Sequence, residues 1–302
     1  MRVPPFNAVA SAVACVWIWA AVVSVNVFGQ QSSTASPPRT TALQPALEAS
    51  SEVVDYTSAS GSLRLRGVLF RSGGAGQSPA IVFLHGGSGA SDKTVATIGR
   101  TFVSKGYLVF VPFRRGLGLS AGSGEPLDAR LAKEEESNGI PARMRLMARL
   151  LETELLDDAL GAIDYVRRRP DVDSSRVAVY GHSQGGMLSV LAAARNAGIR
   201  ATVASAPGAV NWASGPEIRD MLRIAAKNAQ APIFFLQASN DYDLAPTEQL
   251  ALEMARVGKP HVRQVYSAWG ASVQEGHGFG VQAPQIWGPD VFGFLSEHMK
   301  AR

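Results

Sequence analysis

The chain has 302 residues, of which 46% are hydrophobic and 18% are charged, a balance that supplies a sizeable core and excludes a wholly disordered protein. Its formal net charge of +4 arises from 29 basic and 25 acidic residues without a dense run of Lys or Arg, so nucleic-acid binding is not expected. The one cysteine, Cys15, lies near the N-terminus, which leaves the rest of the chain without disulfides, a thiolate metal site or a cysteine nucleophile.

The N-terminal segment, residues 1–29, has the pattern of an export signal. Arg2 provides a positive start, and the stretch from Ala8 to Phe28 is almost wholly apolar. Two interpretations remain open: a signal peptide that is removed, or a retained membrane anchor. Either one places the folded part outside the cytoplasm, as a periplasmic or secreted protein. Residues 30–51 are rich in Ser, Thr, Pro and Ala and are predicted to form a flexible linker.

Short apolar runs alternate with helix-like segments from residue 52 to residue 302. Strands are expected at 53–58, 63–70, 80–84, 107–111, 177–180, 200–205, 232–236 and 261–266. Helices are expected at 91–104, 142–169, 187–196, 216–229, 247–256 and 285–300. The second of these strands alternates in polarity, whereas the later runs are continuously apolar. We therefore expect one α/β domain with a doubly wound, mostly parallel sheet, helices on both faces and N-terminal antiparallel edge strands.

Residues 123–150 include a long charged segment that this alternation does not explain. The expected helix at 142–169 is longer than a normal sheet requires, and its first turns carry Met144 and Met147. Two interpretations remain open for this segment. In the first, the initial turns of the helix form a lid over a site. In the second, the helix is simply elongated and packs its apolar face on the core.

The sequence GHSQG at 181–185 lies directly between an apolar strand and a helix. In this context a Gly-x-Ser-x-Gly turn is typical of a nucleophile elbow, in which Ser183 stands on a tight turn with its hydroxyl exposed. Glycines two positions before and after the serine are expected because strand and helix pass closely there. The same pattern recurs at 118–122, but no strand enters it and no helix leaves it, so Ser120 is predicted to be a loop serine.

A second glycine-rich turn, HGGSG at 85–89, follows the strand expected at 80–84. Its backbone N–H groups, together with that of Gln184, are predicted to hold the charged oxygen of a tetrahedral intermediate. The turn lacks the Gly-Lys-Ser/Thr ending of a phosphate-binding loop, which disfavours a phosphate site. An ordinary tight turn is the remaining alternative.

A serine nucleophile needs a base, and the base needs an acidic partner. Of the downstream histidines, His261 begins a strand and His298 lies in the last helix, whereas His277 lies in what we predict to be a mobile, glycine-flanked loop. We therefore expect His277 to be the base. Asp241 and Asp243 both follow the strand at 232–236, and we favour Asp241 as the acid because it is nearer to the strand end. Asp243 is expected to cap the next helix.

Two further residues are candidates for substrate binding. Arg115 follows the strand at 107–111 and either contacts an acidic group of a substrate or braces its own loop through carbonyl groups. Trp212 either forms a wall of a substrate pocket or packs in the core.

Over residues 52–300 the chain resembles the α/β-hydrolase superfamily, nearest to its dienelactone-hydrolase-like branch. The motifs that carry the resemblance are His85-Gly86-Gly87, Arg115-Gly116-x-Gly118-x-Ser120, Gly181-His182-Ser183-Gln184-Gly185-Gly186, Asn240-Asp241 and His277-Gly278-Phe279. The resemblance implies that Ser183 is the nucleophile, Asp241 the acid and His277 the base, with backbone donors from Gln184 and the Gly87 region. Dienelactone hydrolases carry cysteine at the elbow, and the serine found here points to an esterase.

The function expected from the sequence is cleavage of a small-molecule carboxylic ester through an acyl-enzyme intermediate, without a metal or an organic cofactor. Membrane contact is expected only through an uncleaved N-terminal segment. One alternative is a serine peptidase or amidase of the prolyl-oligopeptidase-like type without its propeller. The other is a catalytically silent hydrolase fold that serves for binding.

Overall fold

The computed structural model describes residues 51–71, 76–195 and 198–301. The predicted export signal or anchor at 1–29 lies outside these residues, and so does the predicted linker up to residue 50. Ser51, expected to end that linker, already belongs to the first strand. None of the helices in the described part of the chain combines the length and the apolar character needed to cross a membrane.

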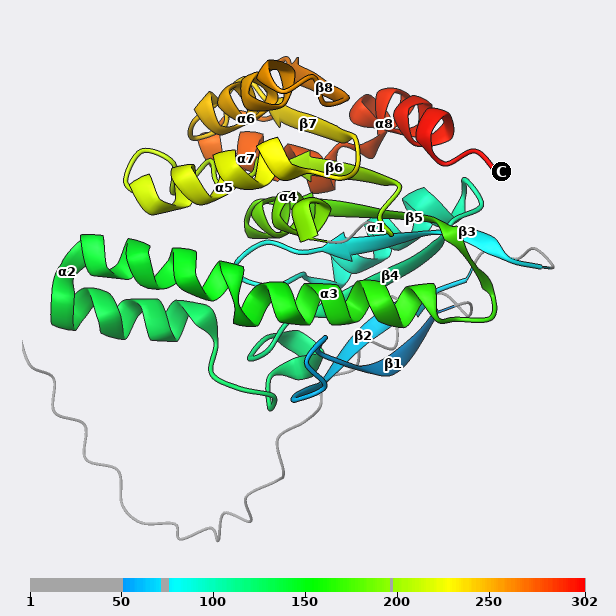
Figure 1. Ribbon diagram of the computed structural model, residues 1–302, viewed down its shortest axis with the longest axis horizontal. Coiled ribbons are helices and arrows are strands. Elements are labelled where there is room, and N and C mark those ends of the chain that lie inside the picture. The colour runs from blue at the N-terminus through cyan, green and yellow to red at the C-terminus, as the bar shows by residue number, and fades with distance from the viewer. Residues whose placement is uncertain (1–50, 72–75, 196–197, 302) are drawn as a thin grey trace, which may run out of the picture. The chain divides into compact units, whose positions relative to one another are not determined.

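An eight-stranded sheet forms the centre of the described structure, with strand order β1-β2-β4-β3-β5-β6-β7-β8 (Figure 1). The strands are β1 (Ser51–Thr57), β2 (Arg64–Phe70), β3 (Ser78–Leu84), β4 (Leu108–Phe113), β5 (Val172–His182), β6 (Ala201–Ser205), β7 (Ile233–Ala238) and β8 (His261–Tyr266). The pairs β1–β2 and β2–β4 are antiparallel, and all other neighbours are parallel. This topology confirms the predicted fold class.

Helices cover both faces of the sheet. They are α1 (Asp92–Val103), α2 (Leu127–Glu152), α3 (Glu154–Arg167), α4 (Gln184–Arg195), α5 (Pro216–Asn228), α6 (Ala245–Arg256), α7 (Val273–Gln282) and α8 (Pro284–His298). Successive side chains of a strand point to opposite faces, so Val82 of β3 packs in a core with α2 to α6, whereas Phe83 packs in a second core with α1, α7 and α8. In Figure 1, α3, α4 and α5 lie in front of the sheet and α1 lies behind it.

The segment before β5 differs from the expectation. Helix α2 begins at Leu127, within the charged segment to which no element was assigned from the sequence, and folds back on itself at Gly139, whose φ of 79° interrupts the helix (Figure 1). The helix predicted at 142–169 is in fact two helices, because Thr153, with φ −112° and ψ −95°, separates α2 from α3. Periodicity did not reveal this break because apolar residues continue at helical spacing across it.

The apolar residues of α2 join the core under one face of the sheet. Met144 and Met147, which were candidates for a lid, are 0% and 4% exposed and belong to the same hydrophobic cluster as Val82. The structure therefore places these two side chains where a core-packing helix requires them.

Candidate active site

The backbone turn at Ser183 is built by close packing. Ser183 lies between the end of β5 and the start of α4 and adopts a φ of +56°, which non-glycine residues rarely do. A Cβ on Gly181 would lie 2.0 Å from the carbonyl oxygen of Gly185, and a Cβ on Gly185 would lie 1.9 Å from that of Leu84. Neither position can accept a side chain, so the two glycines of the motif are a steric requirement of this turn.

Three side chains from three separate elements form a continuous hydrogen-bonded line. His277 Nε2 lies 2.9 Å from Ser183 Oγ, and His277 Nδ1 lies 2.8 Å from Asp241 Oδ1. Because an ionised carboxylate only accepts hydrogen bonds, Nδ1 carries the proton and the serine hydroxyl donates to Nε2. The Asp241 side chain is 1% exposed and also accepts from Gln237 Nε2 at 2.8 Å and from the Tyr242 backbone N–H at 2.7 Å.

The two aspartates of the same loop have different partners. Asp241 contacts His277, whereas Asp243 Oδ1 accepts from the backbone N–H of Ala245 at 2.8 Å, at the start of α6. The structure thus brings the favoured aspartate to the histidine and leaves the other at the helix start, as expected from their distances along the chain.

The prediction that His277 lies in a mobile loop is wrong. His277 lies within α7, whose first turn is fixed by a capping box between Ser272 and Glu275. The flanking glycines serve close packing: a Cβ on Gly276 would lie 2.5 Å from Asn240 Oδ1, and a Cβ on Gly280 would lie 1.9 Å from Ser205 Oγ. These glycines lower the helix propensity of the sequence, but they let α7 approach the sheet closely enough to present the imidazole.

The glycine-rich turn after β3 lies beside the elbow. A Cβ on Gly86 would lie 3.6 Å from Ser183 Cβ, and the space around Gly87 is open. Gln184 is the first residue of α4, where backbone N–H groups have no acceptor within the helix. The N–H groups predicted to hold an oxyanion therefore belong to backbone segments on two sides of the serine.

A cavity of about 300 Å³ opens next to Ser183 and His277. It extends between the turn after β3, the start of α1 and the exposed side of α7, and no residue of α2 belongs to its lining. Apart from His85, His182 and His277, the polar side chains that line the cavity are neutral amides and hydroxyls. These are Ser88, Ser91, Thr94, Ser183, Gln274 and Gln282.

His182, which the sequence did not identify as important, lies directly behind the histidine of the site. Its ring centroid is 5.1 Å from that of His277, and its Nδ1 lies 3.2 Å from Ser205 Oγ. Burial, and secondarily the neighbouring His277, lower the pKa of His182 to about 3. His182 is therefore neutral at physiological pH and adds no positive charge beside His277.

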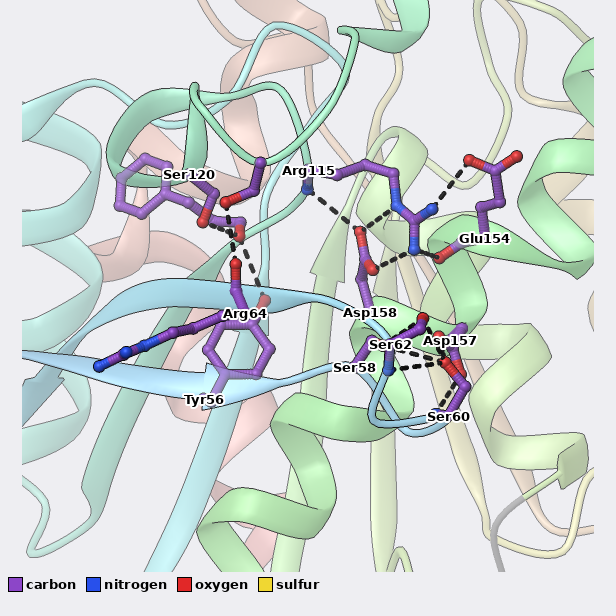
Figure 2. A network of polar contacts seen from close by, with 12 residues as sticks. Tyr56, Ser58, Ser60, Ser62, Arg64, Arg115, Ser120, Glu154, Asp157 and Asp158 are labelled. Carbon is purple, nitrogen blue, oxygen red and sulfur yellow. Dashed lines mark hydrogen bonds and ion pairs between the residues drawn. The ribbon is translucent and has the colours of Figure 1, made fainter.

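The serine of the second Gly-x-Ser-x-Gly pattern has a structural role. Ser120, which Figure 2 labels, is 1% exposed, and its Oγ donates to the carbonyl oxygen of Phe113 at 2.8 Å. The same oxygen accepts from the Arg66 backbone N–H at 2.9 Å. The first bond fastens the turn to the end of β4, and the second fastens it to β2. The prediction that Ser120 is not at an elbow is confirmed.

The two residues considered for substrate contact lie outside the cavity lining. Arg115 donates to Asp158 Oδ1 at 2.6 Å, to Asp158 Oδ2 at 3.0 Å and to Glu154 Oε2 at 2.8 Å, so its guanidinium is engaged by two carboxylates (Figure 2). Trp212 is 3% exposed and belongs to the hydrophobic core. Arg115 therefore braces its loop, mainly through carboxylates and not only the carbonyls that were expected, and Trp212 packs in the core.

Comparisons with known proteins bear on the family and the fold of this chain. Residues 65–296 match the dienelactone hydrolase family. Among curated proteins, the polyketide transferase grgF of a Penicillium species is 27% identical over 208 residues, which are 67% of this chain and 62% of that protein. The chain thus spans less than two thirds of the length of this relative.

Solved structures share the fold at lower identity. The acylaminoacyl peptidase of Pyrococcus horikoshii is 19% identical with a TM-score of 0.60, and the match covers 83% of this chain and 42% of the peptidase. The esterase Pf2001 of Pyrococcus furiosus is 15% identical with a TM-score of 0.59, over 83% of this chain and 93% of the esterase. At such identities the likeness shows the fold alone.

Proposed function

The chain belongs to the dienelactone hydrolase family, and we propose that it is a serine esterase that cleaves carboxylic esters through an acyl-enzyme intermediate. The observation that carries the proposal is the unbroken hydrogen-bonded line from Asp241 through His277 to Ser183. A serine hydroxyl is a weak nucleophile until an adjacent base takes its proton, and this line supplies the base and the group that orients it.

The proposed reaction has two halves. Ser183 Oγ attacks the ester carbonyl carbon while its proton passes to His277 Nε2, and the buried Asp241 carboxylate stabilises the imidazolium that forms. The N–H groups of Gln184 and Gly87 hold the oxyanion of the tetrahedral intermediate. When the intermediate collapses, the bond to the alcohol breaks and His277 returns the proton to it. A water molecule, deprotonated by His277, then releases the acid and restores the serine.

The cavity supports a small, uncharged substrate. Its volume of about 300 Å³ is at the lower end of the range for small-molecule sites. The neutral hydroxyl and amide groups of Ser88, Thr94 and Gln282 can bind carbonyl or hydroxyl groups of an ester. From the predicted N-terminal export segment we further propose that the enzyme acts outside the cytoplasm, either as a released protein or held by a membrane anchor.

The test is esterase activity with active-site labelling. Wild-type protein is expected to hydrolyse a short-chain p-nitrophenyl ester and to be labelled at Ser183 by a fluorophosphonate. Ser183→Ala should abolish labelling and lower kcat by as much as about 10⁶-fold. Ser120→Ala is the matched control from the same five-letter pattern and should retain most activity. Equal losses in the two variants, or no labelling of folded wild-type protein, would contradict the proposal.

A serine peptidase or amidase is the second candidate, because the fold is shared with the Pyrococcus horikoshii acylaminoacyl peptidase and the same three side chains can attack an amide. Parallel assays of ester and peptide substrates with the same acyl group distinguish the two activities. Adding an alcohol as acyl acceptor to the ester assay also tests for acyl transfer, the activity that the name of the Penicillium relative states.

A further inference from the structure

Arg114 is a buried cation directly behind the two backbone segments that flank Ser183. It follows the last residue of β4 and is 1% exposed. Its Nη1 donates to the carbonyl oxygen of His85 at 2.7 Å, and its Nη2 donates to the carbonyl oxygen of Gly86 at 2.8 Å. Nη2 also donates to the side-chain oxygen of Gln184 at 2.7 Å. One guanidinium therefore joins the turn after β3 to the first residue of α4.

The charge of this guanidinium is not matched by an acid in contact. Its three acceptors are neutral oxygens, and the nearby Asp158 is already bonded to Arg115. Burial lowers the pKa of Arg114 to about 10, which still leaves it protonated at neutral pH. Asp158 attracts this charge only through space, without a hydrogen bond or ion pair, and a buried charge that lacks a contacting partner weakens the fold. Packing alone therefore does not account for a cation at this position.

The hydrogen bonds of Arg114 act on the peptide groups that face the substrate. The carbonyl of Gly86 and the N–H of Gly87 belong to one peptide group, so a cation bound to that oxygen draws electron density away from the N–H at the other end. Hydrogen bonds in such chains strengthen one another. The third bond fixes Gln184, whose backbone N–H is the second proposed donor. Both proposed donors are thus tied to the same charge.

We propose that Arg114 is a positioning residue for the oxyanion site: it holds the Gly86–Gly87 peptide group and Gln184 in register and polarises them toward the developing negative charge. This inference rests on the proposed esterase function. Arg114 is then expected to stabilise the transition state more than the bound substrate, because the negative charge on the substrate's carbonyl oxygen develops only as the serine attacks.

The experiment compares two variants of Arg114 with a control at the next residue. Arg114→Lys keeps the charge but cannot form the three bonds of a planar guanidinium, and Arg114→Met removes the charge at similar length. Arg115→Met is the control, because it also breaks a buried contact, with Asp158, but does not touch the turn after β3. Each protein is titrated to completion with a fluorophosphonate, so that kcat is expressed per competent site.

The measurements are kcat, KM and the inhibition constant of a trifluoromethyl ketone, which forms an oxyanion when the serine adds to it. Loss of one complete oxyanion donor lowers kcat by about 10² to 10³-fold, so weakening both donors in Arg114→Lys is expected to lower kcat per site by about 10 to 100-fold. KM should change little, and the inhibition constant should rise by the factor by which kcat/KM falls. Arg115→Met should keep its kcat per site while losing thermal stability.

Two outcomes would overturn the inference. In the first, the Arg114 variants keep the wild-type kcat per titrated site. In the second, they lose activity while the inhibition constant is unchanged. If neither Arg114 variant folds, Gln184→Leu provides the test, because it removes one of the three acceptors of Arg114. Its kcat/KM should fall by a smaller factor, and its inhibition constant should rise by that same factor. Failure of the proposed function itself is recognised separately, because wild-type protein would then neither hydrolyse esters nor react with the fluorophosphonate.

Discussion

The buried imidazole of His182 should make the stability of the protein depend on pH in a way that a single substitution removes. His182 is 8% exposed, and burial together with His277 lowers its pKa to about 3. In the unfolded chain the same imidazole has a pKa of about 6.5. Replacing it in His182→Gln removes the titrating group and keeps a side chain able to hydrogen bond with Ser205.

The sign follows from proton binding in the two states. Between pH 6.5 and pH 3 the unfolded state carries a proton on this residue and the folded state does not, so protonation stabilises the unfolded state and stability falls as the pH falls. At pH 4.5, which is two units below the unfolded pKa, the loss is about 2.7 kcal/mol at roughly 1.36 kcal/mol per unit. Near pH 7 the loss almost vanishes.

The assay is urea unfolding of both proteins at pH 7.0 and pH 4.5. The free energy of unfolding of His182→Gln, relative to wild type, is expected to be higher at pH 4.5 than at pH 7.0 by about 2.7 kcal/mol. His85, whose pKa is also lowered by burial and by Arg114, is present in both proteins and cancels in the comparison.

The reasoning would be refuted if the difference between His182→Gln and wild type were the same at both pH values. That result would mean that the imidazole is protonated in the folded protein at pH 4.5. The charged ring of His182 would then lie 5.1 Å from the ring of His277, which the proposed reaction also protonates. The conclusion that His182 adds no positive charge beside His277 would have to be given up.

Three further predictions concern the site and its support. Asp241→Asn should lower kcat by about 10⁴-fold because an amide can no longer fix the protonated tautomer of the base, whereas Asp243→Asn should retain activity; the same ester assay measures both. Gly185→Ala should yield little folded protein in expression and circular dichroism tests, since its Cβ would lie 1.9 Å from a backbone carbonyl oxygen of β3. Arg115→Met should lower the free energy of unfolding by about 3 kcal/mol, because it leaves the fully buried Asp158 carboxylate without its partner; urea titration measures the loss.

The sheet and the elbow could be predicted from the sequence because local pattern and tertiary structure agree there. The runs at 80–84 and 177–180 are apolar at every position, as strands covered on both faces must be, and both lie within central parallel strands. Ser183 was distinguishable from Ser120 because only the first has a strand before it and a helix after it. In both cases the immediate neighbours in the chain contain the required information.

The helical setting of His277 could not be predicted, because its cause lies elsewhere in the chain. Glycines at 276, 278 and 280 indicate a loop when only local propensity is considered. In the structure Gly276 and Gly280 lie against Asn240 and Ser205, so the absence of a side chain is what allows the helix to pack there. Tertiary packing, which an isolated sequence does not display, outweighs the local preference.

The roles of the two adjacent arginines, Arg114 and Arg115, also could not be predicted from the sequence. These roles have a consequence for which substrates the site can accept. A pair of cations at the carboxyl end of a central strand suggests recognition of an acidic ligand, but in the structure the protein itself uses both. Arg114 is bonded to the carbonyl oxygens of His85 and Gly86, and Arg115 is bonded to Asp158. An acidic substrate would have to displace one of these buried contacts to find a counter-charge. Since the side chains that line the cavity beside Ser183 are otherwise neutral, the proposed esterase function is expected to favour an uncharged ester over one that carries a carboxylate.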